Sequence, residues 1–478
     1  KMIDTRRNTN SGVTRSVSRW TARYWRHFQR KMIHLGISEG FHDAAVAVVE
    51  DKQILFATNI ERVTGKKNDK NIPDKYIKEL KDTYDYDKTV FYEHFDIKNV
   101  RRETFGLAKT EACRPYDIRN IFHHEAHYAA AYYTAPFVPD STVVIDAIGE
   151  FDTATIWVKG RKVWSKQYPW SLGLFYSAIT KRIGLKPNED EYITMGMAAF
   201  GTPCIDMGEV LNEYLHTGLP LKKWFWNKPV DIAASAQMRL EYEVEQIFLE
   251  ARKYGNKVAY GGGVALNCVA NSKIAKLFDQ MWIFPNPGDA GSALGCILAK
   301  TKKKIDYTHT FWGYNIDREL NPNEVVAELL NSKVVGVANG RAEFGPRALG
   351  NRSLLADPRH DVKNKVNKIK RRQKFRPFAP AILEEEYEKY FDGYGNEFMQ
   401  FVSKAKHDYK SVVHVDGTSR VQIVKDDGSN LRKILECWYE VTKCPMLLNT
   451  SLNIKGQPIV NTWEQALEFQ NKYGVKVL

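Results

Sequence analysis

The runs Ile33-His-Leu-Gly-Ile-Ser38, Ala44-Ala-Val-Ala-Val-Val49 and Gln53-Ile-Leu-Phe-Ala-Thr-Asn59 decide the fold class of this chain. Each run is as long as a strand and rich in apolar residues, and the turn-forming Gly40 and the acidic pair Glu50-Asp51 separate them. The sequence therefore predicts three successive strands. A strand–turn–strand meander with small polar residues at its bends suits a site where phosphate meets backbone amides.

Further strands alternate with helices along the rest of the chain. The residues 142–146, 257–260 and 333–338 are strand-like, and residues 239–253 have the pattern of a helix. This alternation predicts an α/β protein. The sequence shows no internal repeat.

The length of 478 residues exceeds what one hydrophobic core usually supports, so we expect at least two domains. We place a basic leader at 1–31, a first domain at 32–305, a hydrophilic linker at 306–330 and a second domain at 331–478. Three interpretations of the leader stay open: a basic arm that touches nucleic acid, an organelle-type presequence, or translated sequence upstream of a start at Met32.

The composition is that of an ordinary globular protein, with 43% apolar and 27% charged residues. No run approaches the roughly 20 apolar residues of a membrane helix, so we expect no membrane partner. Six cysteines without a CxxC pair, and no visible secretory signal, favour a cytoplasmic location.

The net charge of +13 is uneven, because the leader holds nine Lys/Arg against Asp4 and so contributes +8, which leaves 13 − 8 = +5 for the rest. A second basic run lies in the second domain and is either a solvated helix face or a surface for phosphate or nucleic acid. Its members are Lys363, Lys365, Lys368, Lys370, Arg371, Arg372, Lys374 and Arg376.

The segment His123-His-Glu-Ala-His127 is the strongest candidate for chemistry. On a helix His123 and His127 share one face, at the spacing that lets two imidazoles bind one metal ion. Asp146 follows a strand, and Asp289 lies in a loop dense in flexible residues; alone, each would be read as a cap or turn residue. Two His and two Asp form a mixed N/O site suited to iron, manganese or zinc.

Glycines open a second candidate site, where Gly261, Gly262 and Gly263 leave a strand and lead to Asn267. Without side chains, backbone amides can approach an anionic group there, although a generic turn is an equal alternative. The segment matches neither the P-loop nor the GxGxxG motif.

In the second domain, arginines stand beside rigid turns in the segment 340–353, and a Lys-x-Arg pair precedes Pro380. We expect the pair on one side of a strand, where it could hold phosphate by charge-assisted bonds. The candidate ligand-binding residues here are Arg347, Arg352, Lys374, Arg376, Asn449, Ser451 and Asn453.

Read in order, these motifs resemble the NodU/CmcH-type O-carbamoyltransferases, the family of tobramycin carbamoyltransferase. The match runs from about Met32 to the C-terminus and includes His42-Asp43, Glu61-Arg62, HHEAH, SLGLFYSAIT, GGGVALN, NPGDAGSALG, GPRALGNRS, FRPFAP and LNTSLN. The resemblance implies a Kae1-like domain of the actin/hexokinase-type ATPase fold, built of ribonuclease-H-like repeats, followed by a YrdC-like α/β domain.

The resemblance also implies the reaction. The YrdC-like domain would combine carbamoyl phosphate with ATP to form carbamoyl-adenylate, and the Kae1-like domain would pass the carbamoyl group to an acceptor hydroxyl. His123, His127, Asp146 and Asp289 would hold a divalent metal, foremost iron, with manganese, zinc or magnesium as alternatives. His42 would be the general base.

By the same resemblance, Lys374 and Arg376 would be the Lys-x-Arg pair, and Ser451 and Asn453 the Ser-x-Asn pair, with Arg347 and Arg352 around the phosphates. Two departures stand out. Ile193 occupies a position that is commonly Lys in the family, and the chain is shorter than typical members in regions that shape the acceptor pocket.

The acceptor is open at this stage. Our leading hypothesis is a hydroxymethylated pyrimidine in DNA, motivated by the basic leader and the second basic run; the alternative is a small hydroxylated metabolite or sugar. Transfer RNA threonylcarbamoylation and a catalytically inactive binding module are further hypotheses that the motifs favour less. A homodimer is one assembly that we consider.

Overall fold

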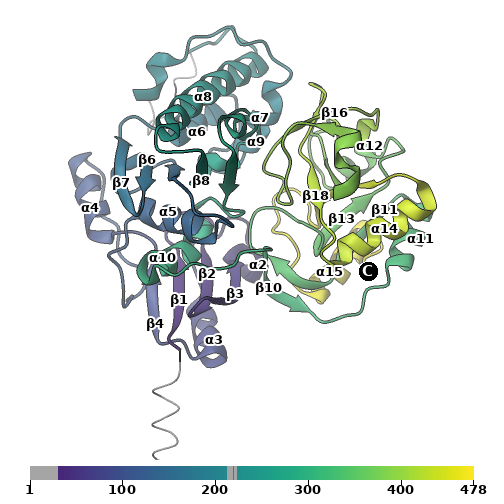
Figure 1. Ribbon diagram of the computed structural model, residues 1–478, viewed down its shortest axis with the longest axis horizontal. Helices are drawn as coiled ribbons and strands as arrows, with labels where there is room; N and C mark the ends of the chain where they lie inside the picture. The colour runs from purple at the N-terminus through teal and green to yellow at the C-terminus, as the bar shows by residue number, and fades with distance from the viewer. Residues whose placement is uncertain (1–30, 213–218, 220–222) are drawn as a thin grey trace, which may run out of the picture.

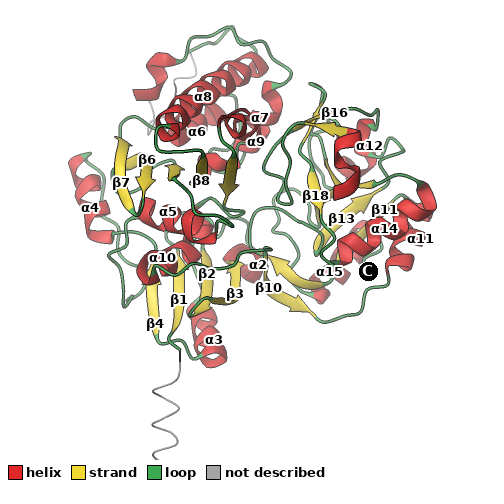
Figure 2. Cartoon of the chain, viewed as in Figure 1, coloured by secondary structure: helices red, strands yellow, loops and turns green. Residues whose placement is uncertain are grey.

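The computed structural model describes residues 31–212, 219 and 223–478, so nearly all of the basic leader lies outside the described residues. The described chain forms two α/β domains side by side (Figure 1). The alternation of strands and helices is evident throughout (Figure 2), and the predicted fold class is confirmed.

The first sheet begins with the three strands that the sequence predicted. Its strands are β1 (Ile33–Ser38), β2 (Ala45–Glu50), β3 (Gln53–Asn59) and β4 (Lys88–Phe91). Their order is β3-β2-β1-β4, with β1 antiparallel to β2 and parallel to β4. The side chains of Val46, Ala47 and Val48 are fully buried on both faces of β2, which explains its uninterrupted apolar sequence.

A second sheet repeats the same arrangement. Its strands are β5 (Ser141–Ile145), β6 (Asp152–Val158), β7 (Arg161–Gln167), β8 (Lys257–Gly261) and β9 (Gln280–Ile283). The order β7-β6-β5-β8-β9 again combines an antiparallel meander with parallel strands. In the first sheet, Ile118 bridges Val90 in parallel at the place that β9 occupies here. Two such ribonuclease-H-like units make the actin/hexokinase-type ATPase architecture.

Two helices fill the space between these sheets. Helix α10 (Ser292–Thr301) packs on β1 and β2, helix α5 (His123–Thr134) packs on β5 and β8, and the helices cross each other (Figure 1). They approach closely because Gly295 has no side chain; a Cβ there would lie 2.1 Å from the Ala126 carbonyl oxygen. The other α-helices in the described part of this domain are α2 (Ile60–Thr64), α3 (Asp74–Tyr84), α4 (Phe95–Thr104), α6 (Leu172–Arg182), α7 (Glu191–Ala198), α8 (Pro229–Arg252) and α9 (Cys268–Ile274).

The C-terminal domain is built on one five-stranded sheet of order β11-β13-β19-β14-β18. The strands are β11 (Val334–Ala338), β13 (Arg352–Ala356), β14 (Ala379–Leu383), β18 (Gln422–Val424) and β19 (Met446–Ser451). Helices α11 (Pro322–Ser332) and α14 (Asn430–Thr442) pack on each other over one face, around the fully buried Trp438. Helices α12 (Lys363–Ile369), α13 (Tyr387–Tyr390) and α15 (Trp463–Tyr473) complete the domain.

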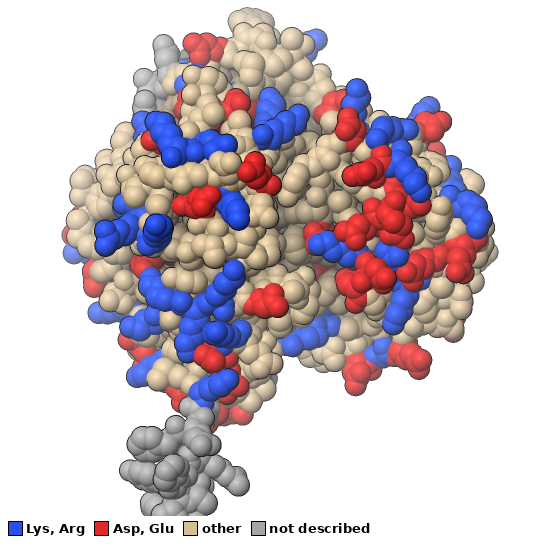
Figure 3. All heavy atoms as spheres, in the orientation of Figure 1, with Lys and Arg blue, Asp and Glu red and all other residues tan. Residues whose placement is uncertain are grey.

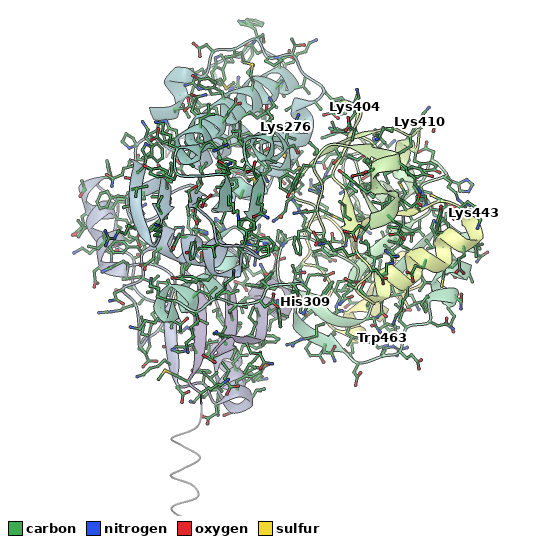
Figure 4. The ribbon with its side chains drawn as sticks, in the orientation of Figure 1. Lys276, His309, Lys404, Lys410, Lys443 and Trp463 are labelled. Carbon is green, nitrogen blue, oxygen red and sulfur yellow. The ribbon has the colours of Figure 1, made fainter. Side chains whose placement is uncertain are left out.

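The stretch expected as a linker, 306–330, is not an irregular connection. It contains strand β10 (Phe311–Ile316), which pairs with β12 (Gly340–Glu343), and most of helix α11. His309 precedes β10 where the two domains meet (Figure 4). Within the C-terminal domain, the guanidinium carbon of Arg318 lies 3.8 Å from the centroid of the Trp463 ring.

One apolar cluster crosses the domain boundary, because Phe344 and Leu349 pack into the core that contains Phe284 and Tyr307. The two domains are therefore held against each other by buried surface rather than by the connection alone. None of the helices in the described parts of the chain combines the length and apolar character that crossing a membrane requires.

Candidate active site

The first site forms where the carboxyl ends of β5 and β8 meet the start of helix α5. His123 is the first residue of this helix, and its backbone N–H donates to the buried carboxylate of Glu150, 3.0 Å away. The anion at the helix N-terminus is favoured by the helix dipole. Asp146 directly follows β5, and Asp289 lies at the start of a short 3-10 helix, η4 (Asp289–Gly291).

The four predicted metal ligands converge. His123 Nε2 lies 3.0 Å from Asp146 Oδ2, 3.1 Å from His127 Nε2 and 3.4 Å from Asp289 Oδ1. His127 Nε2 lies 3.3 Å from Asp289 Oδ1 and 3.8 Å from Asp146 Oδ2. All four ligand atoms lie within 4.8 Å of one another, and all four residues are buried.

These distances fit one transition-metal ion. Ligands about 2.1 Å from such an ion are separated from their neighbours by about 3.0–3.4 Å, in octahedral or tetrahedral geometry. Supporting contacts to two of the ligands also fit, whereas His123 Nδ1 is buried without a hydrogen-bond partner. Asp146 Oδ1 accepts the Gly263 N–H at 2.7 Å, and Ser292 Oγ lies 3.3 Å from His127 Nδ1.

The charges in this cluster control its protonation. Burial alone would lower the pKa of His123, but the carboxylates of Asp289 and Asp146 outweigh it and raise the pKa to about 9. Burial would raise the pKa of Asp146, but its hydrogen bond with His123 and the charges of both imidazoles lower it. His124 is different, because burial and the neighbouring His123 hold its pKa well below the usual range.

His42 faces this cluster from the loop after β1. Its side chain is 29% exposed, and Nδ1 lies 3.0 Å from Asp43 Oδ2. Burial would lower the pKa of His42, but the hydrogen bond to Asp43 and the charge of Asp289 raise it to about 9. A cation that neutralises Asp289 and Asp146 removes part of this rise, which returns the imidazole toward the range of a general base.

The glycine triplet is required by the same geometry. Gly262 has a φ of +92°, and a Cβ there would lie 2.3 Å from the Ile145 carbonyl oxygen. The anionic group that we expected the amides to approach is, for Gly263, the Asp146 carboxylate. Asn267 caps helix α9 by accepting the Ala270 N–H and is bonded to Gln237. Gly263 thus positions Asp146, a candidate metal ligand, and Asn267 organises the start of helix α9.

The second site lies in the C-terminal domain around a buried lysine. The ammonium of Lys370 donates to the backbone carbonyl of Ser451, and it lies 3.3 Å from Ser451 Oγ and 3.0 Å from Asn453 Oδ1. Burial, followed by the charge of Arg372, holds the pKa of Lys370 well below its usual range.

Arginines gather beside this lysine without acidic partners. Among the described residues, no carboxylate forms an ion pair with Arg347, Arg376 or Arg420, and Arg420 Nε is buried without a hydrogen-bond acceptor. Burial and the charge of Arg420 lower the pKa of Arg347 to about 9. Arg376 lies over the ring of Tyr192 from helix α7, 4.5 Å from its centroid, so the cluster borders the N-terminal domain. Such an arrangement is suited to bind a polyanion.

Two family models match this chain over most of its length. The model described as "Carbamoyltransferase N-terminus" matches residues 33–101, 85–223 and 212–298, and "Carbamoyltransferase C-terminus" matches residues 326–478. The chain belongs to the carbamoyltransferase family. It is accordingly a transferase.

Relatives of this carbamoyltransferase include the nodulation protein NolO of Bradyrhizobium diazoefficiens, 30% identical over 72% of this chain and 75% of NolO. The 3'-hydroxymethylcephem-O-carbamoyltransferase of Amycolatopsis lactamdurans is 30% identical over 51% of each chain. Among solved structures, HypF of T. kodakarensis gives a TM-score of 0.35 at 12% identity, covering 57% of this chain and 48% of HypF. The fold assignment rests on the strand order of this chain's own sheets.

Some predicted residues of the C-terminal site lie elsewhere than we expected. The side chain of Arg352 is fully buried and donates to five backbone carbonyls, those of Asn339, Gly340, Asn351, Asn461 and Tyr314. Its N–H groups are occupied by protein, so this geometry supports a role in holding loops together rather than in contacting phosphate.

Lys374 is exposed, and both Lys374 and Arg376 lie in a turn before β14, so the expected strand placement was wrong. The residue that reaches Ser451 and Asn453 is Lys370. Lys370-x-Arg372 has the same spacing as Lys374-x-Arg376 in the same basic run. The sequence therefore offered two Lys-x-Arg pairs and did not show which lysine contacts Ser451 and Asn453.

Two other residues complete the description. Asn449 is buried and donates to the Ala348 carbonyl at 3.2 Å, beside Arg347. Ile193, at the position that is commonly Lys in the family, is 1% exposed within helix α7, while the adjacent Tyr192 makes the contact with Arg376.

Proposed function

We propose that this carbamoyltransferase is ATP-dependent and works in two steps at its two sites. In the C-terminal domain, water cleaves carbamoyl phosphate to phosphate and carbamate, and a carbamate oxygen then displaces pyrophosphate from the α-phosphate of ATP to form carbamoyl-adenylate. In the N-terminal domain, the acceptor oxygen forms a bond to the carbamoyl carbon, and AMP leaves. The observation that supports this most is the presence, in one chain, of a cationic cluster without acids and a buried His₂Asp₂ cluster.

The first step suits the C-terminal cluster. Forming an adenylate moves negative charge onto phosphate oxygens, and preorganised cations stabilise that charge. Lys370, Arg347, Arg376 and Arg420 provide four such groups. Burial lowers the pKa of Lys370, Arg347 and Arg376, and Arg420 Nε is buried without an acceptor, so the charge of a bound polyphosphate would stabilise these cations.

The second step suits the N-terminal cluster. A divalent metal held by His123, His127, Asp146 and Asp289 would supply a Lewis acid for the developing charge on oxygen, and the donor set favours iron, manganese or zinc. His42 stands beside the cluster to accept the proton of the acceptor hydroxyl at Nε2, while Asp43 holds Nδ1 and so fixes the ring.

For the acceptor, we propose the hydroxymethyl group of a 5-hydroxymethylpyrimidine in DNA. The ring of Phe41 is 49% exposed and lies 4.4 Å from the ring of His42, centroid to centroid, where it can stack against a flipped base. The name of the Amycolatopsis relative specifies a hydroxymethyl group as its acceptor. On the face shown in Figure 3, basic side chains are more frequent on the N-terminal domain and acidic ones gather on the C-terminal domain, which favours a polyanion on the N-terminal side.

The second basic run gives less support to a DNA acceptor than its sequence suggested. Lys370 is buried in the C-terminal site, Arg372 donates to Asn367 and Pro377, and Arg376 lies over Tyr192. The alternative acceptor is therefore a small hydroxylated metabolite or sugar.

The proposal is tested by incubating the protein with ATP, carbamoyl phosphate, a divalent metal and a panel of acceptors, read by mass. The panel contains hydroxymethylated DNA, unmodified DNA and small hydroxylated compounds. We expect one carbamoyl group on hydroxymethylated DNA and release of AMP, and neither with an Asp289→Asn variant. Carbamoyl transfer only to small compounds overturns the DNA acceptor, and absence of AMP release with every acceptor overturns the ATP-dependent reaction. DNA binding should also weaken steeply as salt is raised.

A further inference from the structure

We propose that Arg62, in the N-terminal domain, positions the loop that carries Arg347 in the C-terminal domain. The phosphate-binding arrangement of the second site would then depend on the docked first domain. This inference rests on the proposed adenylate-forming role of the C-terminal site. It assigns a function to a buried arginine that neither of the two sites uses.

Arg62 reaches across the domain boundary from helix α2. Its side chain is 1% exposed, Nη2 donates to the Gly345 carbonyl at 2.9 Å, and Nη1 lies 4.0 Å from Glu343 Oε2. Gly345 is two residues before Arg347. A guanidinium that is buried this completely needs its partners, because an unpaired buried charge is strongly destabilising.

Glu343 ties the other end of the same loop. Its Oε1 accepts the Leu349 N–H at 2.7 Å and the Asn351 N–H at 3.1 Å, and its side chain is fully buried. The Glu343 carboxylate therefore accepts hydrogen bonds from the backbone that follows Arg347. It also pairs with Arg62, which donates to the backbone that precedes Arg347. Arg62 and Glu343 together fix both sides of the loop.

The loop also touches the part of the chain that carries a metal ligand. A Cβ added to Gly345, whose φ is +149°, would lie 3.3 Å from the Pro285 carbonyl oxygen and 3.6 Å from the Asn286 side chain. These two residues lead into the loop of Asp289. The Arg347 loop is thus held between Arg62 and the loop of Asp289, so its position follows that of the N-terminal domain.

A matched arginine separates loop positioning from domain docking. Arg341 also crosses the boundary, donating to the Leu55 carbonyl at 2.6 Å and to the Trp312 carbonyl at 3.0 Å. Its side chain has no hydrogen bond to residues 343–351 among the described contacts. Loss of Arg341 therefore weakens docking and leaves the bonds at Gly345, Leu349 and Asn351 in place.

The experiment compares Arg62→Met, Arg62→Lys and Arg341→Met with the wild-type protein. Steady-state kinetics of carbamoyl-phosphate-dependent AMP release give KM and kcat, calorimetry with inorganic pyrophosphate gives binding without turnover, and thermal unfolding reports folding. Misplacing a positioning group by about 1 Å can cost about 100-fold. We expect Arg62→Met to raise KM and weaken pyrophosphate binding by about tenfold or more, with partial recovery in Arg62→Lys and values near wild type in Arg341→Met.

The outcomes are distinct. Wild-type-like KM and pyrophosphate binding in a folded Arg62→Met variant overturn the inference, as do equal losses in Arg62→Met and Arg341→Met, which would mean docking alone. If the wild type releases no AMP, the proposed reaction fails, and pyrophosphate binding still decides whether Arg62 positions the loop. If the wild type also binds no pyrophosphate, the inference fails with it.

Discussion

Adding a methyl group at Gly263 should disturb the proposed metal centre through Asp146, without replacing any of the four candidate ligands. The Gly263 N–H donates to Asp146 Oδ1 at 2.7 Å, and a Cβ on the same residue would lie 2.8 Å from that oxygen. Ordinary van der Waals contact begins at 3.4 Å, so the carboxylate must move by 3.4 − 2.8 = 0.6 Å. Metal–ligand distances tolerate only about 0.2 Å. In Gly263→Ala we therefore expect metal affinity to fall by about 10–100-fold, the range seen when the partner of a ligand is lost.

The assay is equilibrium competition between the protein and a metal-binding dye, with metal content measured after dialysis. Gly288→Ala is the matched control, because Gly288 precedes Asp289, has a φ of −79°, and leaves open space around an added Cβ. Its affinity should equal that of the wild type. Unchanged affinity in a folded Gly263→Ala protein would refute the reasoning, because it would mean that Asp146 is not held by this contact when metal is bound.

Three further predictions address the C-terminal domain. Lys370→Met should reduce AMP release by about 100-fold or more, as for loss of a preorganised donor, whereas Lys374→Met should stay near wild type. Equal effects of the two substitutions would support the Lys374-x-Arg376 pair that the sequence suggested. Arg352→Met should lower the free energy of unfolding by about 3 kcal/mol or more because buried carbonyls lose their donor, measured by denaturant titration. Burial lowers the pKa of His407 to about 4, so between pH 6.5 and 4 the unfolded chain binds more protons and stability falls as pH falls. The loss should be about 1–2 kcal/mol after allowance for partial exposure, and His407→Gln should abolish it.

The sequence predicted most of the N-terminal site because its constraints are local. Apolar runs between turns predict the strands at 33–38, 45–50 and 53–59, and these runs are apolar because the strands are largely buried. His123 and His127 lie one helical turn apart, and Asp146 and Asp289 end strands or open loops, where functional side chains collect. That all four form one site was a prediction from their residue types as well as from the resemblance, and the structure brings their ligand atoms within 4.8 Å.

The repeated topology of the two sheets was expected only from the family resemblance, because the sequence itself shows no internal repeat. The units share strand order and direction, yet Ile118 alone stands where the other unit has the four-residue strand β9. The hydrogen bonding of the backbone defines such a unit, and different apolar side chains can occupy the equivalent buried positions of the two units. Without shared residues at a fixed spacing, no periodicity appears in the text.

The errors in the C-terminal site have a different cause. A basic run offers several lysines at equivalent spacing, and only tertiary packing decides that Lys370 turns inward while Lys374 stays exposed. The predicted phosphate contact of Arg352 has a different explanation. An arginine beside a turn that resembles a phosphate-binding loop can equally donate to backbone carbonyls of its own domain. Charge in a sequence predicts that a partner exists and leaves open whether the partner is substrate or protein.

The charges buried at the domain boundary indicate that this interface fixes the position of a loop, at a cost in stability. Burial lowers the pKa of Arg62 and of Arg352, and the charge of Glu343 opposes this shift in both. Burying such groups costs more than packing apolar residues of similar size. A boundary selected for stability alone would be apolar, as it is around Phe344 and Leu349. Where the boundary meets the Arg347 loop, it contains the buried charges of Arg62 and Glu343. Directional bonds fix a loop's position more narrowly than apolar contact does, and a loop that presents Arg347 to a polyanion is where that precision is needed.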